Sequence, residues 1–384
     1  MKTGIISICK DINDPRMDRK KIHKMESIVY IAMVAVICGA QSWNEIEEFG
    51  NAKLSFFKAH IPGLETIPSH DTFNRFFSIL DPDQFEQVFR NWVKQICREV
   101  KGVVSIDGKL MRGPSRCNED HPLGNKNFRL WIVSAWSKAN GISLGQEKVG
   151  EKSNEITAIP RLLAALDISD CIITIDAMGC QNKITQEIIE RKGDYVIALK
   201  KNQRISYKKA AKMLEESRLN NKDQKHISHF VSQSKGHGRL ETRTVTILGG
   251  YQKLMADIFK NRFEGLNSVI EVIRERKNIK TGVTTMQTRY YISSLNYKDP
   301  ERIADIIREH WSIENNLHWQ LDVSFREDLS KKTKNAARNF SAVTKIALSV
   351  LKNDKTTKGS INLKRLKAGW SNDYLEKLLQ ENAF

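Results

Sequence analysis

Two aspartates stand at the ends of short apolar runs, where a pair of carboxylates could hold a cation. Asp107 follows the run 103–106, and Asp176 follows the run 172–175. If these runs are neighbouring strands, the two carboxylates repel each other at close range unless a cation lies between them. A single aspartate after a strand is usually a turn former, as Asp107-Gly108 suggests. The pair is more specific and predicts a magnesium site.

Glu314 is a third candidate because it falls in an apolar stripe with helical spacing. This spacing predicts that Glu314 lies on the inward face of its helix. A buried carboxylate needs a partner, either a metal shared with the two aspartates or a buried Arg or Lys. The other members of the stripe are Ile303, Ile306, Ile307, His310, Leu317, His318 and Leu321.

A zinc site is the alternative to magnesium at this helix, since His310 and His318 lie one turn before and one turn after Glu314. The helix lacks the His-Glu-x-x-His order of helical zinc sites, and no cysteines have CxxC spacing. Scattered free thiols in a reducing compartment are expected instead. The six cysteines are Cys9, Cys38, Cys97, Cys117, Cys171 and Cys180.

The elements that would position the aspartates alternate between strand and helix. Short apolar runs predict the strands, and apolar residues three or four apart predict the helices. Strands are expected at 103–107, 130–136, 142–149, 171–176 and 195–199, and helices at 159–166 and 183–191. Three adjacent strands suggest an antiparallel meander, and the helix-strand units suggest parallel additions to the same sheet. The fold class is therefore α/β.

The first 98 residues predict a small helical N-terminal domain. Ser42 with Glu45 has the pattern of a capping box, and Asp81 with Pro82 has the pattern of another helix start. Ser69 is expected to cap a helix that continues through residue 75. That helix fits either a DNA-reading helix-turn-helix or an ordinary helical bundle.

Residues 203–295 break the strand-helix rhythm with one helix and two predicted hairpins. The first hairpin pairs 226–234 with 239–247, and the second pairs 269–276 with 284–292. The first turn could contact a DNA phosphate, since its two glycines admit close approach and three basic side chains surround it. A plain hairpin turn is the alternative. The turn reads Lys235-Gly236-His237-Gly238-Arg239.

Composition favours a globular protein that binds a polyanion. The net charge of +17 and the pI near 9.5 point to nucleic acid, because clustered Lys and Arg release counterions from phosphates. The longest apolar run, 29–40, is shorter than the roughly 20 residues that a bilayer requires, and no signal pattern precedes it. We expect a cytoplasmic protein with no membrane partner.

Together, several motifs resemble the DDE transposases of bacterial insertion sequences, and within them the H-repeat-associated group. The resemblance covers nearly the whole chain. The motifs are Ser105-Ile106-Asp107-Gly108-Lys109, Gly145-Gln146, Lys152-Ser153-Asn154-Glu155-Ile156, Thr174-Ile175-Asp176-Ala177-Met178-Gly179-Cys180-Gln181, Asp194-Tyr195-Val196, Gly236-His237-Gly238-Arg239 and His310-Trp311-Ser312-Ile313-Glu314-Asn315-Asn316-Leu317-His318-Trp319.

The resemblance implies an RNase H-like catalytic domain at 99–355, with a β-rich insertion at about 203–295 and a C-terminal tail at 356–384. It implies that Asp107, Asp176 and Glu314 hold two Mg²⁺ ions, with Mn²⁺ as a substitute, for DNA cleavage and strand transfer. Many relatives carry Arg four residues before the glutamate and Lys seven after it. Here those places hold His310 and Leu321, and Arg308 or His318 are the candidate substitutes.

The expected partner is double-stranded DNA, both the element ends and the target, bound by a homo-oligomer near the bacterial nucleoid. Two other functions remain open: an RNase H-like nuclease without strand transfer, and a catalytically decayed DNA-binding remnant. The candidate DNA-binding residues are Arg112, Lys200, Lys201, His237, Arg239, Arg243 and His318.

Overall fold

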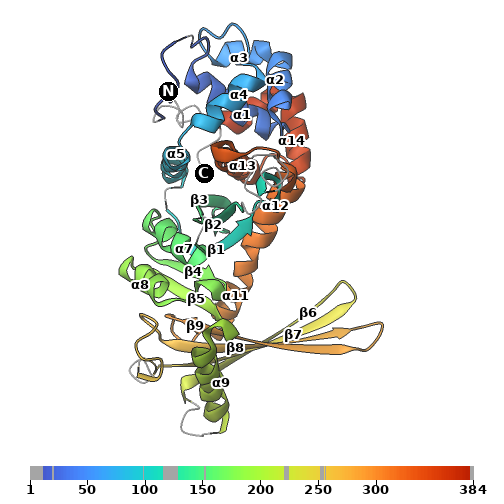
Figure 1. The fold of residues 1–384 in the computed structure, drawn as a ribbon. Helices are drawn as coiled ribbons and strands as arrows, with labels where there is room; N and C mark the ends of the chain where they lie inside the picture. The colour runs from blue at the N-terminus through green and yellow to red at the C-terminus, as the bar shows by residue number, and fades with distance from the viewer. Residues whose placement is uncertain are drawn as a thin grey trace. The chain divides into compact units, whose positions relative to one another are not determined.

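The computed structural model describes residues 12–19, 21–97, 99–115, 129–150, 153–219, 225–250, 255 and 257–380 (Figure 1). Cys9, Cys117 and Lys152 lie outside the described residues. Packing divides the chain into two compact units. The first comprises Met1–Val100, Gly108–Lys152 and Ile313–Phe384, and the second comprises Lys101–Asp107 and Ser153–Ser312.

The first unit is mainly helical and contains one antiparallel strand pair, β2 with β3. Its described elements are α1 (Met25–Ile37), α2 (Trp43–Ala52), α3 (Leu54–His60), α4 (His70–Ile79), α5 (Pro82–Ile96), β2 (Trp131–Ser137), β3 (Ile142–Lys148), η5 (Glu314–His318), α12 (Trp319–Val323), η6 (Glu327–Leu329), α13 (Lys334–Asn353), α14 (Ile361–Trp370) and α15 (Asn372–Gln380). The helices expected before residue 99 are confirmed.

The core of the first unit is the contact between α1 and α13. Nearly every residue of α1 is buried, which is the pattern of a helix enclosed on all sides. The helix α13 packs on α1 and also contacts α4, α5 and β3. Thus helices from the two ends of the chain share one apolar core.

The helix starts expected at Ser42, Ser69 and Asp81 are confirmed, because each side chain accepts a hydrogen bond from the first turn of its helix. The full capping box at Ser42 is wrong in one detail. The carboxylate of Glu45 accepts from the backbone N–H of Gln41, at 2.6 Å, and not from that of Ser42.

The second unit is built on a mixed sheet with the order β1-β4-β5-β9-β8-β7-β6. The strands β1, β4 and β5 run parallel, and the remaining neighbours are antiparallel. Its described elements are β1 (Gly102–Leu110), whose last residues enter the first unit, α7 (Glu155–Ala164), β4 (Cys171–Ile175), η2 (Ala177–Gly179), α8 (Asn182–Glu190), β5 (Asp194–Leu199), η3 (Lys201–Gln203), α9 (Arg204–Leu219), β6 (Ile227–Gly236), β7 (Arg239–Gly249), β8 (Ser268–Asn278), β9 (Thr284–Ser293) and α11 (Pro300–Ile313).

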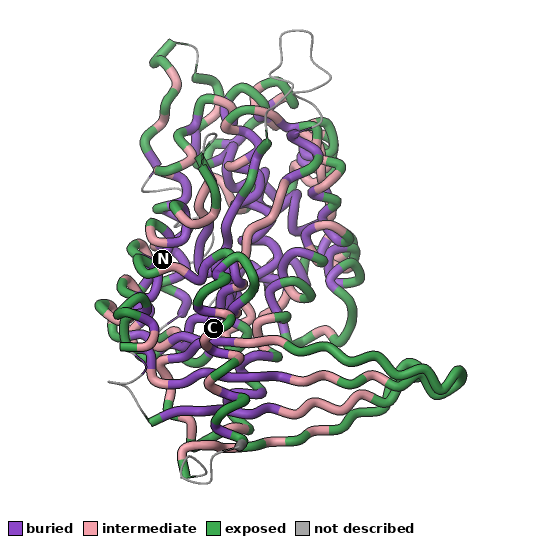
Figure 2. Tube along the Cα trace, turned by 60° about the horizontal axis from the view of Figure 1, so that its bottom comes forward, coloured by how far each residue is buried: buried purple, intermediate pink, exposed green. Residues whose placement is uncertain are grey.

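The α/β class and the two predicted hairpins are confirmed. Strands β6 to β9 are long, and their exposed ends project beyond the buried halves (Figure 2). On one face of the sheet, Val103, Ile172 and Val196 pack with Ile303 and Ile306 of α11 in an apolar cluster. This packing fixes α11 over the parallel strands.

Two further expectations concern cysteines and membranes. The four described cysteines are buried free thiols, as expected from their scattered spacing. No helix among the described residues has the length and apolar character needed to cross a bilayer.

Candidate active site

Asp107 and Asp176 occupy equivalent places on two neighbouring parallel strands. Ile106 pairs with Ile175 in the register of β1 and β4, and each aspartate is the next residue along its chain. Neighbouring strands lie about 4.8 Å apart, so the two aspartates are adjacent at the same edge of the sheet. Both are half-buried. The sequence prediction that these carboxylates follow neighbouring strands is confirmed.

The backbone after β4 fixes the direction of the Asp176 side chain. Its Oδ1 accepts a hydrogen bond from the N–H of Met178, at 2.8 Å, and so caps the short helix η2. Gly179 allows this turn to lie against the strand, because an added Cβ there would be 2.3 Å from Ile175 Cγ2. The turn therefore holds one carboxylate oxygen in place.

A third carboxylate, Glu155, interacts with this pair. It is the first residue of α7, directly after Asn154, whose side chain accepts from the N–H of Ile156 at 3.1 Å. Burial and, to a smaller extent, the charges of Asp107 and Asp176 together raise the pKa of Glu155 to about 7. Such repulsion among carboxylates is relieved when a divalent cation binds between them.

Glu155 belongs to the motif Lys152-Ser153-Asn154-Glu155-Ile156, but the sequence alone did not predict a chemical role for it. The signal that could have found it is its position at a helix start, one residue after a capping asparagine and shortly after a predicted strand. Among the described residues, no group of three or more His, Cys, Asp or Glu side chains is arranged so that it could hold a metal ion.

The helix α11 covers the strands that carry the aspartates. His310 Nδ1 shares a hydrogen bond of 3.1 Å with the Thr174 hydroxyl, which donates to the Ser105 hydroxyl at 3.1 Å. The Ser105 hydroxyl in turn donates to the carbonyl oxygen of Glu309, at 3.4 Å. His310 therefore faces the sheet, as its place in the apolar stripe predicted.

The prediction that Glu314 faces inward is wrong, because Glu314 is exposed. The apolar cluster that α11 forms with the sheet ends at Ile307, so Glu314 lies beyond the part of the stripe that packs in this cluster. The later members of the predicted stripe, Leu317, His318 and Leu321, are buried as expected. Glu314 is the first residue of a π-helical turn, Glu314–His318, in which the N–H of Trp319 bonds to the carbonyl of Glu314. Such turns are frequent at functional sites. Glu314 belongs to the first unit, and its role as the third ligand stays a prediction.

The predicted DNA-binding residues differ in their exposure. Lys200 and Lys201 are exposed at the carboxyl end of β5, which is the sheet edge that carries Asp176. Arg112 is exposed and forms an ion pair with Asp328 at 3.7 Å. His318 is only 8 % exposed, which leaves it little surface to offer DNA, whereas its alternative Arg308 is exposed.

The first hairpin turn has a two-residue loop, His237-Gly238, between the paired residues Gly236 and Arg239. Both loop residues have positive φ, 49° and 73°, as in the turns that suit the twist of a hairpin. An added Cβ would meet open space at Gly236 and at Gly238, so the backbone is approachable from outside. DNA contact by this turn stays a prediction.

The first unit holds a buried network of charged side chains. Lys109 forms ion pairs with Asp322 and, at 3.0 Å, with Glu327. Glu327 accepts a hydrogen bond from Ser341, to which the ammonium of Lys345 donates at 2.7 Å. Burial alone would raise the pKa of Glu327, but Lys109 and Lys345 outweigh it and hold that pKa at about 2.

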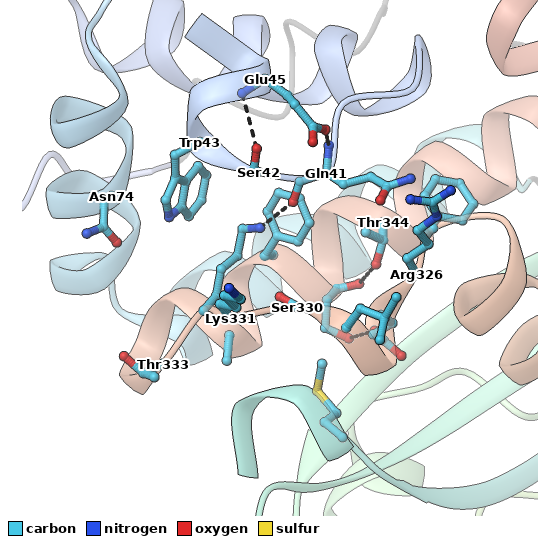
Figure 3. Close-up of a pocket in the computed structure, with 18 residues that line it drawn as sticks. Gln41, Ser42, Trp43, Glu45, Asn74, Arg326, Ser330, Lys331, Thr333 and Thr344 are labelled. Atoms are coloured by element: carbon cyan, nitrogen blue, oxygen red, sulfur yellow. Dashed lines mark hydrogen bonds between the residues drawn. The ribbon is translucent and has the colours of Figure 1, made fainter. Parts of the chain in front are cut away.

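A pocket of about 470 Å³ lies beside this network (Figure 3). Lys332 lies 3.5 Å from the ring centroid of Phe340 and 4.8 Å from that of Trp43, and it donates to the carbonyl of Gln41 at 2.5 Å. Burial lowers the pKa of this ammonium to about 7. None of the three predicted catalytic carboxylates lines the pocket, so it is not the predicted active site.

Two protein-family models and several known proteins together match nearly the whole chain. A family model described as DDE_Tnp_1-associated matches residues 6–93, and a model described as Transposase DDE domain matches residues 98–350. The chain is 37 % identical over 372 residues to the "H repeat-associated putative transposase YhhI" of Escherichia coli strain K12, covering 96 % of this chain and 95 % of that protein.

A second relative is the "Putative transposase YncI" of Escherichia coli O157:H7. It is 38 % identical over 380 residues, covering 97 % of this chain and 93 % of that protein. Among solved structures, a cryo-EM structure of the piggyBac transposase synaptic complex with hairpin DNA aligns with a TM-score of 0.43 and 11 % identity, over 98 % of this chain and 78 % of that chain.

Proposed function

Since this chain belongs to the transposase DDE domain family, we propose that it cleaves DNA at the ends of an insertion sequence and joins those ends to target DNA. The observation that carries the proposal is the adjacency of Asp107 and Asp176 at the carboxyl ends of paired parallel strands. This placement also supports an RNase H-like catalytic domain.

We propose that Asp107, Asp176 and Glu314 hold the metal, with Glu155 beside the two aspartates. The residues present fit a divalent cation, because oxygen ligands suit Mg²⁺ and Mn²⁺ and because burial, with the charges of Asp107 and Asp176, raises the pKa of Glu155. When bound, a pair of such ions activates a water or a DNA 3′-hydroxyl and stabilises the leaving oxygen.

The protein's own contribution is to position these groups. The strand register sets Asp107 beside Asp176, the η2 turn orients one carboxylate, and α11 packs over the same strands through His310. Lys200 and Lys201, exposed at this sheet edge, would contact DNA phosphates near the metal. We propose that Arg112, Arg239, Arg243 and His237 make further backbone contacts, that a homo-oligomer assembles on the DNA, and that it acts at the bacterial nucleoid.

The function is tested with the purified full chain and DNA carrying the sequences that flank its gene. With Mg²⁺ or Mn²⁺ we expect cleavage at the element ends and joining to a target plasmid, and with EDTA we expect neither. Cleavage without joined product would identify a nuclease. Binding without cleavage would identify a decayed remnant, and either result contradicts the proposal.

Glu155 gives a second prediction about the same site. Glu155→Gln removes one charge beside the aspartates, so the Mg²⁺ concentration that gives half-maximal cleavage should rise about tenfold to a hundredfold, with DNA binding retained. The control is Glu190→Gln on α8, where the carboxylate bonds only to Gln186 among the interactions described. An unchanged Mg²⁺ dependence in the Glu155 variant would remove this residue from the metal site.

A further inference from the structure

The four strands β6 to β9 pair in continuous register, so directly opposite residues share one face of the sheet. Arg243 lies opposite Arg274, and two residues towards the tip Glu241 lies opposite Arg276. Two residues the other way, Arg289 lies opposite Val272. Because side chains alternate along a strand, these three rows point to the same side. We call Arg243, Arg274, Arg276 and Arg289 the arginine face.

The arginine face lies on the side of the sheet that α11 covers nearer the base of the hairpins. Towards the base of the hairpins, the same face carries Val245, Ile247 and Ile270, which pack in the apolar cluster with Ile303 and Ile306 of α11. The cover ends near the last turn of that helix. There the guanidinium of Arg289 lies 5.4 Å from the ring centroid of Trp311, a half-exposed side chain. Beyond it the face is open to a partner.

Positive charge exceeds negative charge on the arginine face. In its three rows, all of which the structure describes, four guanidinium groups meet one carboxylate, Glu241, which leaves three positive charges in excess. Glu241 pairs with Arg243 and with Arg276, the latter at 2.6 Å. Arg274 donates only to the neutral Gln287 among the bonds described, at 2.8 Å. Burial and the nearby arginines lower the pKa of Arg274.

We propose that the arginine face binds the sugar-phosphate backbone of double-stranded DNA. Like charges fixed on a rigid sheet gain free energy when a polyanion replaces their counterions. The three rows span about 14 Å along the strands, and one DNA strand presents about four phosphates over that length. Gln287 adds a neutral donor between the arginines, of the kind that also bonds to phosphate oxygens.

The inference rests on the proposed function, which makes DNA the substrate, and it adds the surface that holds the DNA. It differs from the hairpin turn at His237, because the arginine face lies on one side of the sheet and not at its tip. Contacts to phosphates carry no base information, so this surface would bind all sequences alike.

The test compares two double variants of the full chain that lose the same charge. Arg274→Gln/Arg289→Gln removes two charges from the arginine face. The control, Lys208→Gln/Lys212→Gln, removes two exposed charges from α9, which packs on the opposite face through Tyr207 against Tyr290. Affinity for a duplex is measured over a series of salt concentrations without divalent metal.

We expect the arginine variant to bind DNA about tenfold to a hundredfold more weakly at moderate salt, with the slope of log affinity against log salt reduced by about two. The α9 control should bind nearly as the wild type does, and Arg274→Lys/Arg289→Lys should retain most of the affinity. Wild-type affinity and slope in the glutamine variant would overturn the proposal, and so would an equal loss in the α9 control.

A second measurement needs no variant. In the wild-type chain, bound duplex should protect Arg274 and Arg289 from modification by phenylglyoxal. Arg161 on α7 is the reference that DNA should not protect, and equal labelling of Arg274 and Arg289 with and without DNA would overturn the inference.

Metal-dependent cleavage by the same preparation distinguishes failure of the arginine face from failure of the proposed function. If the wild type cleaves DNA but the arginine variant binds normally, only the arginine face fails; if the wild type neither binds nor cleaves, the proposed function fails.

Discussion

Asp107→Asn should reduce DNA cleavage and strand transfer at least about a thousandfold while leaving DNA affinity nearly unchanged. Metal ions contribute several kcal/mol to stabilising the charge that develops in phosphoryl transfer, and about 4 kcal/mol corresponds to a thousandfold in rate. The substitution keeps the size of the side chain but removes a charged oxygen ligand beside Asp176. Single-turnover cleavage and a binding assay on the same duplex separate the two effects.

The matched control is Asp170→Asn, which makes the same change at the other end of β4. Asp170 is exposed and has a positive φ of 58°, a conformation that asparagine also adopts readily. This variant should cleave at the wild-type rate. Cleavage by the Asp107 variant at more than a tenth of the wild-type rate would remove that residue from the metal site.

Glu327→Gln should lower the free energy of unfolding by about 3–5 kcal/mol at pH 7. Removing one partner of a buried ion pair leaves the other charges buried without compensation, here Lys109 and Lys345. Urea unfolding followed by tryptophan fluorescence measures the change. Asp328→Asn provides the control, since it weakens an ion pair with the exposed Arg112 and should cost about 1 kcal/mol or less.

The lowered pKa of Glu327 predicts how the stability of the folded chain depends on pH. The pKa of Glu327 is lowered from 4.5 to about 2 in the folded chain, so its stabilising contribution is complete above pH 4.5 and is lost as the pH falls towards 2. The difference in stability between wild type and Glu327→Gln should therefore shrink over that range. A constant difference from pH 7 to pH 3 would show that the carboxylate charge is not the cause.

The two aspartates were predictable because each depends only on local sequence. An apolar run that ends in Asp predicts a strand followed by a polar turn, and the order of elements predicts which strands are neighbours. The register adds what the sequence lacks: Ile106 lies opposite Ile175, so the aspartates are level with each other. Their separation along the sheet could not be derived from the order of elements alone.

Glu314 shows where a periodic pattern fails. A period of 3.6 residues predicts which residues share one side of a helix, but it does not show how far along the helix the packing partner extends, and here the apolar cluster on α11 ends at Ile307. Leu317 and Leu321 continue the stripe after Glu314 and are buried, so the sequence does not show that Glu314 between them is exposed. The arginine face was not predictable for a different reason, because it requires the register between β7 and β8, which belong to two different predicted hairpins.

The contact between α1 and α13 has a consequence for synthesis on the ribosome. The apolar helix α1 is complete at Ile37, but its partner begins only at Lys334, roughly 300 residues later. At about 5–20 residues per second, the nascent chain exposes α1 for roughly 15 to 60 seconds before that partner exists. This interval is long enough for a chaperone that binds apolar segments to act on α1 during translation. Products truncated before α13 would keep α1 exposed and should aggregate.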